Sequence, residues 1–210
     1  MTAEANPKTM KPLLVTLTLV TSLQLAFAQE RLTRDEALFY ARAVSADTTQ
    51  FQGTPIPTNV DLDQPVAMRD EDYGGLVLPQ KGLTLETIAT AGETPVPIGQ
   101  LWLHRLAPMR QGGAVSRSAL RLVTVRAQGA EETVPQCALA VRRNSSGALE
   151  MLVFGKGKEP VLTVPLKPLD VRQSAPIDLA AERDYDSGRL TLKILGKHQA
   201  TIAVTELAPY

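Results

Sequence analysis

Cysteine is nearly absent from this chain, since Cys137 is the only one in 210 residues. No internal disulfide can form, although small exported domains with weak cores often depend on disulfides. The chain must therefore rely on a hydrophobic core, which a domain of this size can bury. Cys137 lies in the apolar stretch VPQCALAV, so we expect it to be a small buried hydrophobe and not a reactive thiol.

Aromatic residues and net charge are also scarce. The chain has four Phe, four Tyr and one Trp, and 22 basic residues balance 22 acidic ones. A neutral surface gives no electrostatic reason to expect nucleic acid or an anionic membrane as a partner. Trp102 lies between two leucines and is expected to pack inside, which leaves Tyr73, Tyr185 and Tyr210 as the aromatic candidates for stacking on a sugar.

Only one long apolar run is present, at residues 13–25. It follows Lys8 and Lys11 and precedes the small-residue site Ala26-Phe27-Ala28, a pattern that predicts a cleavable signal peptide over residues 1–28. A membrane anchor is less favoured, because a spanning helix needs roughly 20 apolar residues. We therefore expect a secreted or periplasmic protein with no integral membrane segment after cleavage. The lack of disulfides favours a bacterial envelope.

The first element after the predicted cleavage site is a helix, which we expect over residues 34–45. Thr33 and Glu36 have the spacing of a capping box, in which each side chain satisfies a backbone donor of the first turn. The apolar positions at helical spacing are Ala37, Tyr40, Ala41 and Val44. This face should dock on the rest of the protein.

The region between this helix and Pro95 has weaker signals. Residues 51–75 contain prolines and acidic residues that break both periodicities, so the segment is predicted to be extended or irregular. The stretch GLTLETIATAGE predicts a short helix with Thr84 as its N-cap and Gly92 as its stop.

From Pro95 onward strand signals dominate. Short alternating runs, such as residues 101–109 and 120–127, are separated by the turn sequences QGG, AQGAEE, NSSG, GKGK, DYDSG and LGKH. Many short strands with turns every 8–12 residues or so predict a mainly β fold, an antiparallel β-sandwich or partly open barrel. We expect this core over residues 95–210, with the helix and irregular segment of residues 29–94 packed on it.

The chain lacks the usual catalytic motifs. It has no G-x-S-x-G elbow, no H-E-x-x-H pair and no glycine-rich phosphate loop before a helix. The two histidines, His104 and His198, fall in or beside predicted strands, where packing is their commoner role. The pattern favours a non-catalytic protein. A pocket that holds either histidine beside a carboxylate would support a small hydrolase instead.

The most suggestive motif is ERDYDSGRL at residues 182–190. Its Asp184, Asp186 and Ser187 have the spacing of the first oxygen ligands of a calcium loop. An EF-hand loop continues to a glutamate at its twelfth position, which here is Leu195. The three residues are therefore only a candidate calcium site.

Such a site would need further carboxylates from elsewhere in the chain. The candidates are Asp61, Asp63 and the acidic run Asp70–Asp72. The simpler interpretation is a turn between two strands, in which Gly188 takes a positive φ angle.

Two function hypotheses follow. The first is an exported, non-catalytic envelope protein that binds a protein partner, as yet unidentified, or is an accessory part of an assembly. The alternative is a calcium- or carbohydrate-binding β-sandwich module, with no other cofactor expected. An exposed hydrophobic patch would favour the first.

Overall fold

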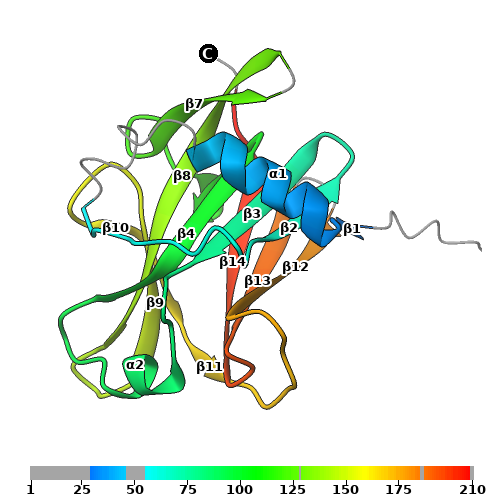
Figure 1. Ribbon diagram of the computed structural model, residues 1–210. Coiled ribbons are helices and arrows are strands. Elements are labelled where there is room, and N and C mark those ends of the chain that lie inside the picture. Colours follow the sequence, from blue (N-terminus) through cyan, green and yellow to red (C-terminus); the bar gives the residue numbers. More distant parts are fainter. Residues whose placement is uncertain (1–28, 46–54, 128, 185–186, 209–210) are drawn as a thin grey trace, which may run out of the picture.

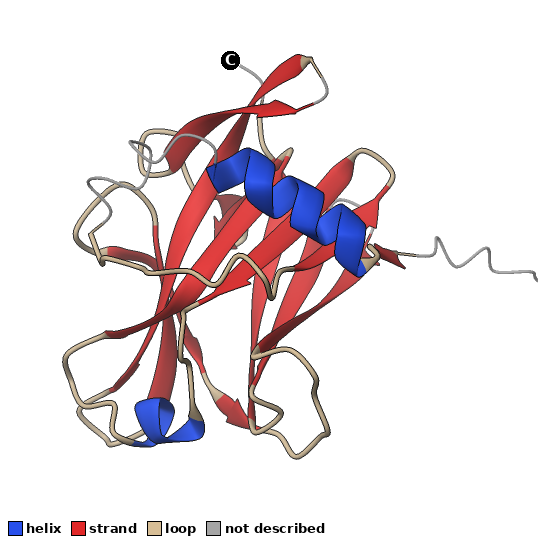
Figure 2. Ribbon diagram, viewed as in Figure 1, coloured by secondary structure: helices blue, strands red, loops and turns tan. Residues whose placement is uncertain are grey.

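Two antiparallel sheets pack face to face in this protein, and helices are few (Figures 1 and 2). The computed structural model describes residues 29–45, 55–127, 129–184 and 187–208. The predicted antiparallel β-sandwich is confirmed. The predicted signal peptide over residues 1–28 lies outside the described residues.

The first sheet, called sheet 1, has eight strands. Their order is β1 (Glu30–Arg31), β2 (Val66–Asp70), β3 (Tyr73–Pro79), β4 (Val96–His104), β8 (Ala130–Arg143), β9 (Leu149–Phe154) and β10 (Pro160–Pro165), and β7 (Arg121–Ala127) pairs with β8 off this path. Because β7 pairs with residues 130–136 of β8, the two form a hairpin at the upper end of the sandwich (Figure 1).

The second sheet, called sheet 2, has six strands. Their order is β12 (Ile177–Asp184), β13 (Ser187–Ile194), β14 (His198–Glu206), β5 (Leu106–Arg110) and β6 (Gly113–Ala114), and β11 (Lys167–Pro168) pairs with β14. The outward side chains of this sheet are mostly polar, for example Thr191 and Thr201, whose hydroxyls lie 2.9 Å apart. The alternation expected for a sheet with one solvated face is therefore present.

The main core lies between the sheets. Val77, Leu101 and Leu139 of sheet 1 meet Leu192 and Ile202 of sheet 2 in one buried cluster. Cys137 belongs to this cluster and is 0% exposed, and burial raises the pKa of its thiol to about 12. The prediction of a small buried hydrophobe at this position is confirmed.

The chain changes sheets at Arg105. The run 101–109 was expected to be one strand, but β4 ends at His104 in sheet 1 and β5 begins at Leu106 in sheet 2. Arg105 has a φ of 54°, a left-handed conformation that bends the backbone between the two strands. Because side chains alternate along β4 and Leu103 faces the core, His104 lies on the outer face of sheet 1, the face turned away from sheet 2.

Helix α1 (Arg34–Ser45) covers part of that outer face (Figure 1). Its bounds and its capping box are as predicted: the Glu36 carboxylate accepts from the backbone N–H of Thr33 at 2.9 Å. The helix buries Ala37, Ala41 and Val44 against the sheet, whereas Tyr40 remains 37% exposed.

Residues 51–75 were expected to be extended or irregular, and residues 66–79 are more regular than that. They form the β2–β3 hairpin, and β3 pairs with β4, so sheet 1 includes strands from the segment 29–94. The acidic run Asp70–Asp72 forms its turn, and Gly74 and Gly75 lie in β3. A Cβ on Gly75 would lie 3.3 Å from the side chain of Leu179, so the glycine allows sheet 2 to pack closely.

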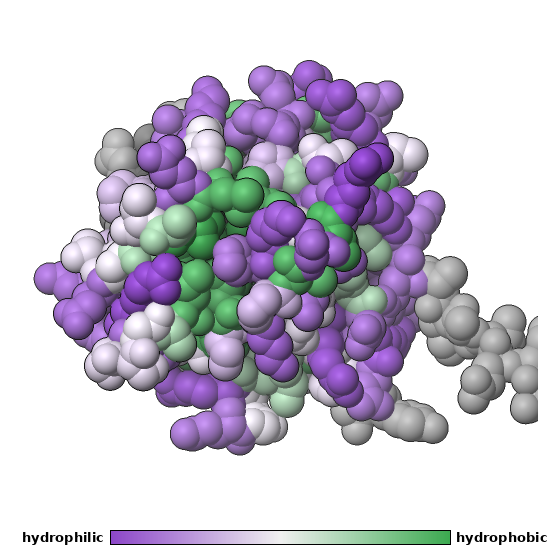
Figure 3. All heavy atoms as spheres, turned by 90° about the horizontal axis from the view of Figure 1, so that it is seen from below, coloured by the Kyte–Doolittle hydropathy of each residue, from purple (hydrophilic) through white to green (hydrophobic). Residues whose placement is uncertain are grey.

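The lower end carries α2 (Leu85–Ala89) and several turns (Figure 1). Thr84 caps this helix as predicted, but the helix ends at Ala89, before the expected stop at Gly92. Seen from below, hydrophobic side chains gather near the middle of this end and hydrophilic ones surround them (Figure 3). Leu85 and Val171 are large hydrophobic residues exposed at 45% and 42%. In the described part of the chain, neither helix is both long and apolar enough to cross a membrane.

Candidate functional site

An apolar hollow of about 280 Å³ lies beside α1 on the outer face of sheet 1, and we call it the α1 groove. Its walls come from α1, the β2–β3 hairpin, β4 and the β7–β8 hairpin. The apolar part is lined mainly by Leu32, Val44, Ala67, Leu76, Trp102, Val125, Ala127, Ala130 and Val134. Apolar concave surfaces with a few polar groups are the usual form of a binding site.

Two aromatic side chains of α1 are exposed near this groove. Phe39 is 42% exposed, and Tyr40, which lines the groove, is 37% exposed. Their rings are in contact edge-to-face, with centroids 5.4 Å apart. Exposed aromatic rings of this kind are enriched at protein interfaces, where they bury a large area at a small entropic cost.

One end of the α1 groove is charged. His104 extends from β4 so that its Nε2 lies 2.6 Å from an Oε of Glu132 on β8. The other carboxylate oxygen of Glu132 lies 3.5 Å from Nε of Arg105, whose Nη1 is 3.4 Å from Asp72. The groove therefore combines apolar walls with a cluster of charged side chains at one end.

The His104–Glu132 pair is the arrangement that would favour a hydrolase, because a carboxylate can orient a histidine as a general base. The described residues that line the groove include no serine, threonine or cysteine. Its candidates for a covalent nucleophile are therefore the carboxylates, His104 and the two tyrosines, Tyr40 and Tyr73.

His198 lies far from this end of the molecule, at the start of β14. Burial, and to a lesser degree the charge of Arg143, lower its pKa below the ordinary value of 6.5. Well above pH 6.5 the residue is neutral in both the folded and the unfolded chain and does not change the stability. Below that pH the unfolded chain takes up the proton first, so stability falls as the solution is acidified.

We expect His198→Gln to reduce this acid sensitivity. The melting temperature of the wild type should fall more between pH 7 and pH 5 than that of the variant, because only the wild type must protonate a half-buried imidazole. Thermal melts followed by circular dichroism over this range test it, with pH 8 as the reference. Parallel curves for the two proteins would contradict the expectation.

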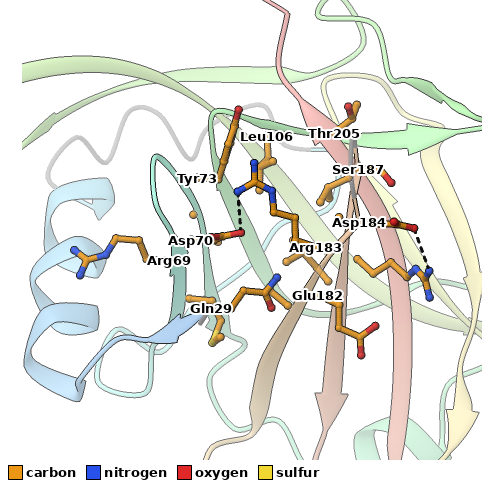
Figure 4. A pocket seen from close by; sticks show the side chains of 18 of the residues that line it. Gln29, Arg69, Asp70, Tyr73, Leu106, Glu182, Arg183, Asp184, Ser187 and Thr205 are labelled. Atoms are coloured by element: carbon orange, nitrogen blue, oxygen red, sulfur yellow. Dashed lines mark ion pairs between the residues drawn. The ribbon is translucent and has the colours of Figure 1, made fainter. Parts of the chain in front are cut away.

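A second hollow, of about 380 Å³, lies between the β2–β3 hairpin and strands β12 to β14, and we call it the upper cleft. Figure 4 shows Arg183 extending from β12 between Tyr73 and Asp70. Its guanidinium lies 3.2 Å from Glu71 and 3.6 Å from Asp70, and 5.7 Å from the centre of the Tyr73 ring. Burial and Glu206 raise the pKa of Tyr73.

The upper cleft contains two segments that the sequence indicated as sources of calcium ligands. Asp184, Ser187 and Asp70 all line it, and Asp186 lies outside the described residues. Asp70 faces Arg183, whereas Asp184 is 3.8 Å from Arg189 (Figure 4). Among the described residues no group of three or more His, Cys, Asp or Glu side chains could hold a metal ion. Because the candidate ligand Asp186 lies outside the described residues, the calcium site stays a prediction.

The hairpin around residues 182–190 partly matches its expected form. Asp184 pairs with Ser187 across the β12–β13 hairpin, as a turn between two strands requires. Gly188 does not take the expected positive φ angle, because it is already part of strand β13. A Cβ there would lie 3.3 Å from both the backbone oxygen of Glu182 and the side chain of Val204, so close packing accounts for the glycine.

Sequence reasoning missed Glu132 and Arg105, which form the charged end of the α1 groove. Glu132 lies in β8 and Arg105 at the bend between β4 and β5, and their ion pair joins positions 27 residues apart. Trp102, in contrast, is 3% exposed as predicted, and its indole N–H donates to the Gln100 side chain at 3.1 Å.

No protein-family model, curated protein or solved structure significantly matches this chain. The geometry of the two hollows is therefore the basis for assigning a function.

Proposed function

We propose that this chain is an exported, non-catalytic protein that binds a protein partner through the α1 groove. The observation that carries the proposal is an apolar groove bordered by the exposed ring of Tyr40, with Phe39 against it. Protein interfaces typically have an apolar centre with aromatic anchors and a polar rim, and the groove has these parts.

The construction of the groove supports a rigid binding surface. Trp102 and Val134 form part of its floor and belong to a buried cluster with Leu76 and the inward face of α1. A floor that is already packed does not have to be ordered on binding, so less of the interaction energy is lost. Export is part of the proposal and rests on residues 1–28.

The proposal predicts that Tyr40→Ala abolishes capture of a partner. Truncation of an aromatic anchor at an interface commonly costs about 2 kcal/mol, which is more than a tenfold loss of affinity. Alanine is also a good helix former, so α1 should stay folded. The measurement is an affinity pulldown from the native envelope fraction with the wild type and the variant as baits.

Leu85→Ala is the matched control, because Leu85 in α2 is an exposed hydrophobic residue, 45% against 37% for Tyr40, at the opposite end of the molecule. The wild type and this control should recover the same protein, and Tyr40→Ala should not. If all three baits recover the same proteins in the same amounts, the α1 groove is not the binding site.

A further inference from the structure

We infer that the partner segment bound in the α1 groove carries a lysine or arginine beside its apolar side chain. This inference rests on the proposed function and specifies the chemistry of the segment. Its apolar side chain packs against Tyr40, Val44 and Val125, and its cation lies at the charged end beside Glu132 and Asp72.

The charged end has an excess of carboxylates. The ion pairs at and next to this end form three separate groups: Arg69 with Glu30, Arg105 with Asp72 and Glu132, and Arg183 with Asp70 and Glu71. Together they hold five carboxylates and three guanidinium groups. The net charge of minus two attracts a cation and repels an acidic segment.

The side chains that line the groove itself also have an excess of negative charge. Glu71, Asp72 and Glu132 line it, and Arg69 is its one guanidinium group among the described residues. Arg69 is already engaged, since its Nη2 lies 2.8 Å from Glu30. A carboxylate on the partner would therefore meet three like charges, and the nearby Arg69 and Arg105 are both already engaged in ion pairs, so the contact costs free energy.

The existing ion pairs at this end are weak enough to be rearranged. Arg105 lies 3.4 Å from Asp72 and 3.5 Å from Glu132, and the side chains of Arg105 and Asp72 are 53% and 79% exposed. Solvent-exposed pairs at such distances contribute little to stability. A basic side chain of the partner can therefore reach Asp72 and the Glu132 oxygen that faces Arg105, and the closer contact of the other Glu132 oxygen with His104 can remain.

The test is a selection of short random peptides displayed on phage against the purified chain, with Tyr40→Ala as the counter-selection target. We expect the peptides that bind only the wild type to share an apolar residue followed closely by Lys or Arg. In a synthetic peptide from this set, replacing the basic residue by Glu should weaken binding about tenfold or more, and added salt should weaken binding of the parent peptide.

A charge exchange makes the assignment specific to this end of the groove. Asp72→Lys should weaken binding of the basic peptide and restore part of the binding of the peptide with Glu in its place. Asp72 is exposed, so the fold tolerates the change. Glu159→Lys is the control, because Glu159 lies on an exposed bend elsewhere. It should change the binding of neither peptide.

The outcomes separate this inference from the proposed function. Peptides that depend on Tyr40 but are acidic or uncharged overturn the inference and leave the α1 groove as the binding site. If no peptide depends on Tyr40, both the inference and the proposed function fail.

Discussion

Gly99→Ala is expected to lower the free energy of unfolding by roughly 3 kcal/mol or more, which is a large part of the stability of a domain this size. Gly99 has a φ of 152°, which side chains rarely allow. A Cβ there would lie 2.3 Å from the backbone oxygen of Leu78 and 3.0 Å from the Cα of Pro79. These are backbone atoms of the neighbouring strand and cannot rotate away.

The measurement is equilibrium unfolding in urea or guanidinium chloride, with Gly92→Ala as the control. Gly92 is exposed, and a Cβ there would have no atom within 4 Å. The control should therefore be as stable as the wild type, within about 0.5 kcal/mol. Equal unfolding midpoints for the two variants would show that the backbone at Gly99 accommodates a Cβ.

Gly99 also determines which side chains of β4 reach the α1 groove. The register with β8 shifts between Pro97 and Gly99, so β4 contains a bulge. Ile98, Leu101 and Leu103 all join the core between the sheets, although Ile98 and Leu101 are three positions apart. A strand without the bulge could not bury both, because successive side chains point to opposite faces. Beyond the bulge, Trp102 and His104 then face outward.

Local sequence signals predicted the elements that depend on local chemistry. The capping box at Thr33 and Glu36 fixed the start of α1, because its bonds join residues three positions apart. The NSSG turn is of the same kind: the Asn144 side chain accepts from the backbone N–H groups of Ser146 and Ala148 at 3.0 Å each. The alternation of apolar residues likewise predicted most strands from Leu120 onward.

The β2–β3 hairpin was not predicted, because its residues form strands through tertiary packing and lack the usual local signals of a hairpin. Its turn consists of acidic residues, and Gly74 and Gly75, which usually mark a bend, lie within β3 instead. The break at Arg105 was missed for a similar reason. Its left-handed backbone is accompanied by ion pairs to Asp72 and Glu132, each many residues away.

The α1 groove could not be predicted from the sequence, because each wall comes from a different element. His104 and Glu132 lie 2.6 Å apart only because β4 and β7 flank β8 in this register. The loop after β11 likewise depends on contacts that the local sequence does not predict. The Gln173 amide donates to three backbone oxygens and accepts from the N–H of Gly196 at 2.9 Å, and no local pattern indicates this role.

Trp102→Ala should lower the free energy of unfolding by about 3–5 kcal/mol and also abolish partner binding. The indole is 3% exposed and lies between the sheet and α1, in contact with the cluster that holds the helix in place. Its removal leaves a cavity under the groove, and α1 loses part of its packing surface. Urea unfolding and the peptide-binding assay on the same preparation measure both effects.

Two further variants distinguish these effects. Trp102→Phe separates the loss of packing from the loss of the hydrogen bond, and Tyr40→Ala separates the loss of binding from the loss of folding stability. Trp102→Phe keeps a ring but removes the N–H that Gln100 accepts, which leaves a buried acceptor unpaired at a cost of about 1–3 kcal/mol. Tyr40→Ala removes an exposed ring from the same groove, so it should lose binding while its unfolding free energy stays within about 1 kcal/mol of the wild type. If Trp102→Ala were as stable as Tyr40→Ala, α1 would not depend on the sheet beneath it. The groove would then be a loose surface instead of a preformed site.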